Sequence, residues 1–340
     1  MHMIRFESRE AFAAALLDLP EANKVAQAAA QLRQDALTKP LGSLGRLEDI
    51  AIFMASWQGR ERPVLEGIRA AIFAGNHGVA AKAVSAYPPE VTAQMVANFA
   101  AGGAAINALA GACGAELVIV PIELDRPTAD FVEQPAMSEE DCLAALNTGA
   151  AVVEEGLDLL FVGEMGIGNT TPAAALCAQA CNGKAAEWVG AGTGLDRDGI
   201  AYKQSVVAQA LSFHGARCTD AFETLRRLGG REIAAIAGAI LAARIKRIPV
   251  LLDGFIVCAS IAPLVVDQPR FAAHCLAAHC SMEAAHARLL DWLGLAPLLQ
   301  LGMRLGEGTG AAVAAQLVRS AIAAHNGMAT FAEARVAGVV

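Results

Sequence analysis

The stretch that decides the fold is LDLLFVGEMGIGNTTPAAALCAQA, residues 157–180. It starts with an apolar run of strand length, passes through a glycine-rich turn and ends in an alanine-rich segment of helical composition. Asn169, Thr170 and Thr171 are residue types that start helices, and Pro172 is favoured in a first helical turn. Strand, glycine turn and helix in this order form the repeating unit of α/β proteins with a parallel sheet.

Apolar runs of similar length recur on both sides of this stretch. They lie at 68–75, 115–122, 157–163, 186–192 and 248–254, and helix-length segments such as 89–111, 138–156, 171–181 and 197–212 separate most of them. The alternation predicts an α/β fold in which helices cover both faces of a mostly parallel sheet. Several runs end in glycine and a polar residue. Because ligands in open α/β sheets bind beyond the carboxyl ends of the strands, we expect one crevice there.

Helical segments flank the α/β region at both ends of the chain. The first part reads as helices that are interrupted at Pro20 and by the loop KPLGSLG at 39–45, and helices return from Ser281 onward. We therefore expect residues 1–66 and 281–340 to form one small helical domain, and residues 67–280 to form the large α/β domain.

The charge balance favours small-molecule partners over nucleic acids. The chain of 340 residues has a net charge of −8, whereas nucleic-acid-binding proteins normally carry clustered Lys and Arg. Its eight cysteines are scattered without a C-x-x-C pair, which is typical of reduced thiols in a chain of this size. We expect a cytoplasmic protein.

Neither a signal peptide nor a membrane span is predicted. Residues 1–12, MHMIRFESREAF, carry charges where a signal peptide needs an apolar core. The closest approach to a span is 248–266, but two prolines and the pair Asp253-Gly254 interrupt the ~20 apolar residues that a spanning helix needs. We interpret 248–266 as a buried strand followed by a short helix.

Two glycine-rich turns are candidates for a phosphate site. The turn at 166–169 precedes a helix, where glycines allow close approach and free N–H groups attract an anion. The second turn, at 190–194, is followed by Asp196, a candidate cap for a helix that begins near Arg197. Lys203 on that helix is a candidate point charge for the anion. The alternatives are an ordinary strand-to-helix turn and a solvated lysine.

Other polar residues suggest a ring pocket and a base. Ser85, Tyr87 and Gln94 suit a flat heterocycle, although loops with proline and tyrosine are common. Glu307 lies between Gly306 and Gly308, so a substrate can approach it closely, and partial exclusion from water would raise its pKa toward that of a useful base. An exposed loop glutamate is the alternative.

A metal site is considered and not predicted. Cys275, His279, Glu283 and His286 would share one face of a continuous helix. Ser281 is more typical of a helix cap, which would leave Cys275 and His279 outside the helix. The role of His77, which follows an apolar run, stays open between a base and a structural group.

Six blocks of the sequence together resemble one enzyme family. They are KPLGSLGRLEDIA (39–51), GNHGVAAKAVSAYPPEVTAQMV (75–96), GEMGIGNTTPAAAL (163–176), VGAGTGLD (189–196), LLDGFIVCASIAPL (251–264) and MRLGEGTGAAVA (303–314). In this order they are similar to the nicotinate-nucleotide:dimethylbenzimidazole phosphoribosyltransferases. The resemblance implies a Rossmann-like large domain, a small helical domain from both termini, a homodimer and a reaction without a cofactor or metal.

The resemblance also implies residue roles. Glu307 corresponds to the general base of the family, and Glu164 and Lys203 match functional positions near the nucleotide. The implied phosphoribosyl contacts are Gly166, Gly168, Asn169, Thr170, Gly192, Thr193 and Gly194, with Ser281 as a lower-ranked phosphate contact. Ser85, Tyr87 and Gln94 fall in the segment that lines the benzimidazole pocket.

The implied reaction moves phosphoribose from nicotinate mononucleotide to 5,6-dimethylbenzimidazole, which gives α-ribazole 5′-phosphate and nicotinate. The base used in the cell stays open, as does whether the 39–45 loop completes a partner subunit's site. The residues leave one other enzyme class, an NAD-dependent oxidoreductase of Rossmann type. Gly166, Gly168 and Glu187 favour it, but Thr171 stands where its fingerprint has a third glycine.

Overall fold

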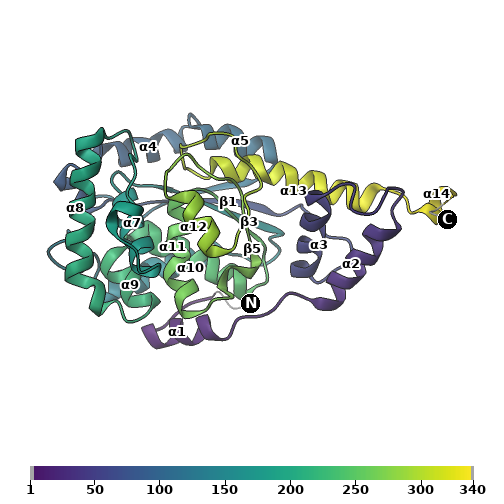
Figure 1. Ribbon diagram of the computed structural model, residues 1–340, viewed down its shortest axis with the longest axis horizontal. Helices are drawn as coiled ribbons and strands as arrows, with labels where there is room; N and C mark the ends of the chain where they lie inside the picture. Colours follow the sequence, from purple (N-terminus) through teal and green to yellow (C-terminus); the bar gives the residue numbers. More distant parts are fainter. Residues whose placement is uncertain (1–3, 338–340) are drawn as a thin grey trace.

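The computed structural model, which describes residues 4–337, contains a five-stranded sheet in the order β2-β1-β3-β4-β5 (Figure 1). All neighbouring strands are parallel. The strands are β1 (Ile68–Ala74), β2 (Glu116–Pro121), β3 (Leu159–Met165), β4 (Val250–Leu252) and β5 (Cys275–Ala277). The predicted α/β fold is confirmed. The chain turns to opposite sides of β1, so the direction of strand addition reverses between β1 and β3.

Helices cover both faces of the sheet, as predicted. Ala71 and Phe73 of β1 point into one apolar core and Ile72 points into the other, since side chains alternate along a strand. The first core is built by α6 (Glu139–Ala151), α7 (Thr170–Ala180), α8 (Arg197–His214), α9 (Ala221–Leu228), α10 (Arg231–Ile245), α11 (Phe255–Asp267) and α12 (His286–Leu293). The second is built by α4 (Glu90–Ala100), α5 (Ala105–Cys113) and α13 (Thr309–Gly327), with part of α3 (Arg46–Gln58).

One predicted strand is wrong, and one strand was not predicted. The run 186–192 is not a strand: a short 3-10 helix, Ala185–Glu187, is followed by a loop whose Trp188 and Val189 are buried against the first core. The run 275–277, on the other hand, forms β5 beside β4. An apolar run becomes a strand only where a neighbouring strand takes up its backbone hydrogen bonds, and its composition does not reveal that neighbour.

The expected helix at 89–111 is divided into α4 and α5 at Gly102-Gly103. Residues Glu90–Cys113 together are long and apolar enough to cross a membrane by composition, and 28% of an 18-residue window within them is buried. The two helices have 11 and 9 residues, fewer than the ~20 that a spanning helix needs. Helices 139–151, 170–180 and 197–214 agree with the prediction, and so does the strand and helix pair within 248–266.

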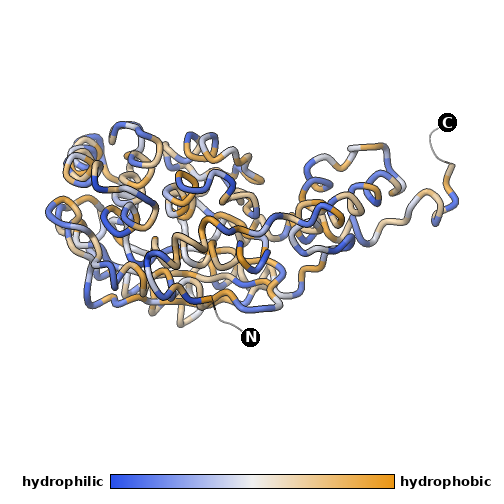
Figure 2. The backbone as a smooth tube through the Cα atoms, turned by 90° about the horizontal axis from the view of Figure 1, so that it is seen from below, coloured by the Kyte–Doolittle hydropathy of each residue, from blue (hydrophilic) through white to orange (hydrophobic). Residues whose placement is uncertain are grey.

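The projecting helical part is smaller than predicted. It consists of α2 (Lys24–Ala36), α3, the last turns of α13 and α14 (Phe331–Ala334), and it projects from the body at the end where α3 packs on the second core (Figures 1 and 2). The Arg33 guanidinium donates to the carbonyl oxygens of His325, Asn326 and Met328 and so ties α2 to the end of α13. Residues 1–3 and 338–340 of the two predicted terminal segments lie outside the described residues.

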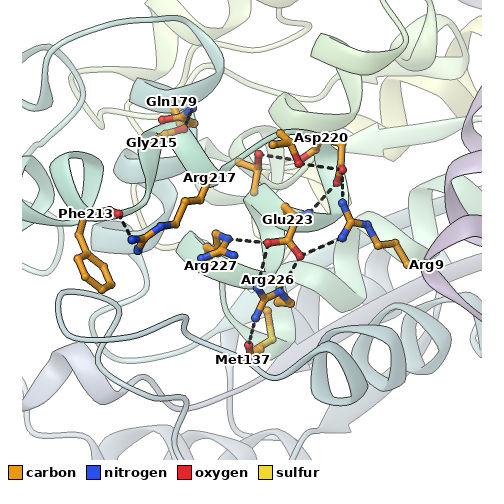
Figure 3. Close-up of polar contacts among 12 residues, drawn as sticks. Arg9, Met137, Gln179, Phe213, Gly215, Arg217, Asp220, Glu223, Arg226 and Arg227 are labelled. Carbon is orange, nitrogen blue, oxygen red and sulfur yellow. Dashed lines mark hydrogen bonds and ion pairs between the residues drawn. The ribbon is translucent and has the colours of Figure 1, made fainter.

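The first helix, α1 (Arg9–Leu17), packs on the α/β body rather than in the helical part (Figure 1). Phe12 and Leu16 are buried in the first core. The Arg9 guanidinium pairs with Asp220 and Glu223 at the start of α9, and Glu223 also accepts from Arg226 and Arg227 (Figure 3). Helix α12 joins the body in the same way, through buried Leu289 and Leu290. The expected division at 1–66 and 281–340 is corrected accordingly, because these apolar faces are buried against the body.

Backbone-to-backbone packing of α6 and α10 holds the first core together. A Cβ added at Gly149 would lie 1.7 Å from the carbonyl oxygen of Ala235, and one added at Gly238 would lie 2.0 Å from that of Leu146. The two helices therefore approach more closely than any side chain at these positions permits.

We expect Gly238→Ala to lower the free energy of unfolding by about 1–3 kcal/mol or more, because the added methyl group overpacks this contact. Gly111→Ala is the matched control. Its Cβ would meet nothing within 4 Å on α5, so the higher helix propensity of alanine should leave stability equal or slightly increased. Urea unfolding followed by circular dichroism measures both. Equal stability of the two variants would contradict the packing argument.

Candidate active site

A cavity of about 420 Å³ lies at the carboxyl edge of the sheet, where the sequence predicted a crevice. Its lining comes from the ends of β3, β4 and β5, the starts of α7 and α11, helix α4 and the loop before α13. The lining residues are Tyr87, Val91, Met95, Glu164, Met165, Gly166, Ile167, Asn169, Thr170, Gly192, Thr193, Gly254, Phe255, Ile256, Val257, His279, Ser281, Glu283, Arg304, Leu305, Gly306 and Glu307.

Glu307 reaches the cavity from a left-handed backbone segment. Gly306, Glu307 and Gly308 have φ angles of 81°, 60° and 76°. A glutamate rarely adopts this conformation, so the surroundings must hold it there. The Asp253 carboxylate does so by accepting the N–H groups of Gly308 and Ala311, at 3.2 and 2.9 Å, at the start of α13.

Close contact with β3 keeps this segment free of other side chains. A Cβ added at Gly306 would lie 2.3 Å from Oε1 of Glu164, and one added at Gly163 would lie 2.3 Å from the nitrogen of Gly308. Space alone therefore requires glycine at 163, where the added atom would meet backbone, whereas the left-handed conformation and the lack of space both favour glycine at 306. The loop brings the carboxylates of Glu164 and Glu307 to the same wall of the cavity.

Both carboxylates are buried and hold their protons more strongly than usual. Burial raises the pKa of Glu307 to about 7, and the nearby Asp253 carboxylate adds to the rise. Burial also raises the pKa of Glu164 to about 8, against the opposing effect of a 2.5 Å hydrogen bond from Nδ2 of Asn169. Oε2 of Glu307 is buried and has no hydrogen-bond partner among the described residues. Because Glu307 lines the cavity, its carboxylate is a candidate acceptor for a proton of a molecule bound there.

The start of α7 and Lys203 form the cationic end of the site. The Lys203 side chain is fully buried, and its Nζ donates to Oγ1 of Thr170 at 2.7 Å. Burial lowers the pKa of Lys203 to about 8, with the Glu283 carboxylate acting in the opposite direction. A Cβ added at Gly192 would lie 2.8 Å from Oγ1 of Thr170. The arrangement combines a helix N-terminus, a hydroxyl group and an ammonium group, all suited to a phosphate.

The structure brings most of the predicted site residues to this cavity. Nine of them line it: Glu307, Glu164, Gly166, Asn169, Thr170, Gly192, Thr193, Ser281 and Tyr87. Asn169 directs its side chain to Glu164 and makes no helix-cap bond. Asp196, in contrast, caps α8 as predicted, by accepting the N–H of Gly199.

Five predicted residues do not line the cavity. They are Gly168, Gly194, Lys203, Ser85 and Gln94. Lys203 lies directly behind Thr170, and Oγ of Ser85 is 2.9 Å from Oγ1 of Thr193, so both stand one contact away. Gln94 is exposed on α4.

Val91 and Met95 occupy the face of α4 that lines the cavity, and the sequence reasoning missed them. A spacing of four residues on a helix was the available signal. Ile256, Arg304 and Leu305 were also missed. Arg304 and Leu305 directly precede the glycine-flanked Glu307, so proximity in the chain was the signal for them.

His77 and His286 have structural partners. Nε2 of His77 lies 2.6 Å from Oε1 of Glu232, and both side chains are fully buried outside the cavity lining. The predicted helix cap at Ser281 is wrong, because α12 begins at His286. The N–H of Ser281 donates instead to Nδ1 of His286. Within residues 4–337 no set of three metal-ligating side chains occurs.

The features that favoured a dinucleotide site are not brought together. Glu187 lies in the short 3-10 helix and pairs with Arg288 at the surface, 3.3 Å away. It does not line the cavity. A ribose-binding acid would follow a strand of the sheet, whereas the element directly before the 3-10 helix of Glu187 is α7.

Comparison with known proteins agrees with this geometry. A phosphoribosyltransferase family model matches residues 19–336. The nicotinate-nucleotide–dimethylbenzimidazole phosphoribosyltransferase of Novosphingobium aromaticivorans is 63% identical over 335 residues, which cover 98% of this chain and 99% of the relative. The enzyme of the same name from Ruegeria sp. is 56% identical, and 96% of each chain is covered.

A solved structure extends the similarity to three dimensions. The crystal structure of CobT from Thermus thermophilus superposes with a TM-score of 0.85 at 39% sequence identity, and it covers 93% of this chain and 100% of its own. The family model, which matches residues 19–336, spans the sheet, the cavity lining and the projecting helices. The chain therefore belongs to the nicotinate-nucleotide–dimethylbenzimidazole phosphoribosyltransferase family.

Proposed function

We propose that this enzyme transfers phosphoribose from nicotinate mononucleotide to 5,6-dimethylbenzimidazole, releasing nicotinate and forming α-ribazole 5′-phosphate. The observation that carries the proposal is the Glu307 carboxylate, which is buried in the cavity with an unpartnered oxygen and a pKa raised to about 7. A group of this kind accepts a proton at neutral pH. The oxidoreductase alternative is not supported by the family.

The reaction breaks one bond to the ribose anomeric carbon and forms another. The bond to the pyridine nitrogen of nicotinate breaks, and its electron pair leaves with the ring as a neutral nitrogen. One benzimidazole nitrogen attacks the opposite face, which converts the β-nucleotide to an α-product. The other N–H of the benzimidazole becomes acidic as the bond forms, and Glu307 accepts that proton. Correct placement of the two rings therefore matters more than strong acid catalysis.

Glu164 acts on the positive charge that develops at the ribose. In the empty cavity its raised pKa keeps the carboxyl protonated at neutral pH. The positively charged pyridinium ring of nicotinate mononucleotide opposes this effect, because an opposite charge nearby favours the ionised carboxyl. An ionised Glu164 then stabilises the cationic transition state.

The remaining residues hold the substrates. The 5′-phosphate is bound at the start of α7 by Thr170, with Lys203 behind it and Ser281 opposite. The ribose lies along the glycine turns that contain Gly166 and Gly192. The aromatic rings contact Tyr87, Val91 and Met95, which are an aromatic and two apolar side chains. Ser85 acts indirectly, since it positions Thr193.

The enzyme works in the cytoplasm as a homodimer, without a membrane or nucleic-acid partner. Eight free cysteines support a reducing compartment. The net charge of −8 disfavours nucleic acids. Leu41, in the loop between α2 and α3, is 73% exposed, and an exposed apolar side chain on a projecting loop suits contact with a second subunit.

Glu307→Gln should lower kcat by about 10²–10⁴-fold, as expected for loss of a general base, while nicotinate mononucleotide still binds. The isosteric amide keeps the size of the side chain and removes its ability to accept the proton. Nicotinate release that depends on both substrates measures turnover, and calorimetric titration measures binding. Unchanged turnover would reject the role of Glu307, and wild-type enzyme that releases no nicotinate would reject the reaction itself.

The rate should rise with pH through about 7, because Glu307 must lose its proton before it can act as a base, and should level off above that. Asp253→Asn removes a negative charge that raises the pKa of Glu307, so this limb should move to lower pH. The pH dependence of kcat/KM for the benzimidazole measures both. If kcat/KM instead rises near pH 8, and this rise disappears in Glu164→Gln, the group that must lose its proton is Glu164 rather than Glu307.

A further inference from the structure

Arg304 is the one arginine or lysine among the described residues that line the cavity. Its side chain is exposed at the rim. Within residues 4–337 its guanidinium forms neither an ion pair nor a hydrogen bond with another residue. A free guanidinium at the mouth of a binding cavity is a candidate for recognition of an anionic group.

The backbone around Arg304 is fixed on both sides. The N–H of Met282 donates to the carbonyl oxygen of Met303 at 2.9 Å, and the N–H of Thr309 donates to that of Gly306 at 3.1 Å. Asp253 holds the next turn through Gly308. These contacts fix Arg304 in the cavity lining three residues before Glu307, the residue to which the proposed function gives the proton of the incoming ring.

The other charged side chains of the lining are acidic and would repel the ring carboxylate of nicotinate mononucleotide. Glu164, Glu283 and Glu307 are the charged side chains besides Arg304 and the titratable His279. Nicotinate mononucleotide carries a carboxylate on its ring in addition to its phosphate. An ionised glutamate near that carboxylate would repel it. A cation at the ring end offsets this repulsion.

The phosphate of the nucleotide has binding groups other than Arg304. The buried ammonium of Lys203 and the start of α7 already provide a cation and free N–H groups at the phosphate end. No lysine or arginine other than Arg304 lines the cavity among the residues described. The ring carboxylate is thus the substrate anion without another cationic partner.

We propose that Arg304 binds the ring carboxylate of nicotinate mononucleotide and makes the enzyme select this nucleotide over nicotinamide mononucleotide. The inference rests on the proposed function of the same cavity. The planar fork of arginine matches a carboxylate with two parallel hydrogen bonds. An amide in place of the carboxylate carries no negative charge and offers one oxygen, so it loses the ion pair.

The exposed position of Arg304 suits a site that holds two different rings in turn. The incoming benzimidazole is uncharged, and a buried arginine facing it would lose its hydration without a partner, at a large cost. At the rim, the guanidinium stays in water when the carboxylate is absent. The same residue can therefore favour the first ring without excluding the second.

The test compares Arg304→Gln and Arg304→Lys with Arg288→Gln in the full-length protein. Arg288 is a matched control because it is an exposed arginine that contacts Glu187 and does not line the cavity. Initial rates are measured with nicotinate mononucleotide and with nicotinamide mononucleotide at saturating 5,6-dimethylbenzimidazole. The KM for the benzimidazole is measured separately.

Arg304→Gln should lower kcat/KM for nicotinate mononucleotide by about ten- to hundredfold, mainly through KM, as expected for loss of a hydrogen-bonded charge pair. The kcat/KM for nicotinamide mononucleotide and the KM for the benzimidazole should change little. Arg304→Lys should keep part of the preference, and Arg288→Gln all of it.

An equal loss of kcat/KM for the two nucleotides would indicate that Arg304 binds the phosphate, which both nucleotides carry, and would overturn the proposal. Unchanged selectivity in Arg304→Gln would overturn it as well. Wild-type enzyme that does not release nicotinate in the presence of both substrates would instead reject the proposed function, so the two failures are distinguishable.

Discussion

The functional geometry of this protein depends on one close contact, in which the backbone at 306–308 is pressed against the end of β3. Gly163 and Gly306 allow the two segments to approach, and Asp253 binds the N–H groups at the start of α13. The left-handed conformation of Glu307 is held by this contact. A side chain at either glycine would push the two glutamates apart.

The same contact determines how strongly the two glutamates hold their protons. Because Glu307 and Glu164 share a wall that excludes water, both hold protons more strongly than free glutamates do. This environment poises Glu307 for proton transfer near neutral pH, whereas an exposed glutamate would be too weak a base. The substrate's own positive ring then acts on a site prepared for cationic charge.

Two basic residues, Lys203 and Arg304, lie in or next to the lining that contains the acidic side chains. Lys203 is fully buried behind Thr170, so its charge serves the closed, phosphate end of the cavity. Arg304 lines the cavity with an exposed side chain, and in the proposed reaction it binds the ring carboxylate. In the proposed reaction, burial therefore separates the phosphate site from a site that accepts a charged ring and a neutral ring in succession.

The sequence by itself determined the α/β fold, the strand–turn–helix unit at 157–180 and the cap of α8 by Asp196, because these depend on interactions within a short segment. The resemblance carried by six blocks also led to the family and to most of the cavity residues. Only the tertiary structure decided that 186–192 is a loop, that α1 joins the body, and that Val91 and Met95 rather than Gln94 line the cavity. Those outcomes depend on which distant segment lies opposite, and a local pattern contains no information about its neighbour across space.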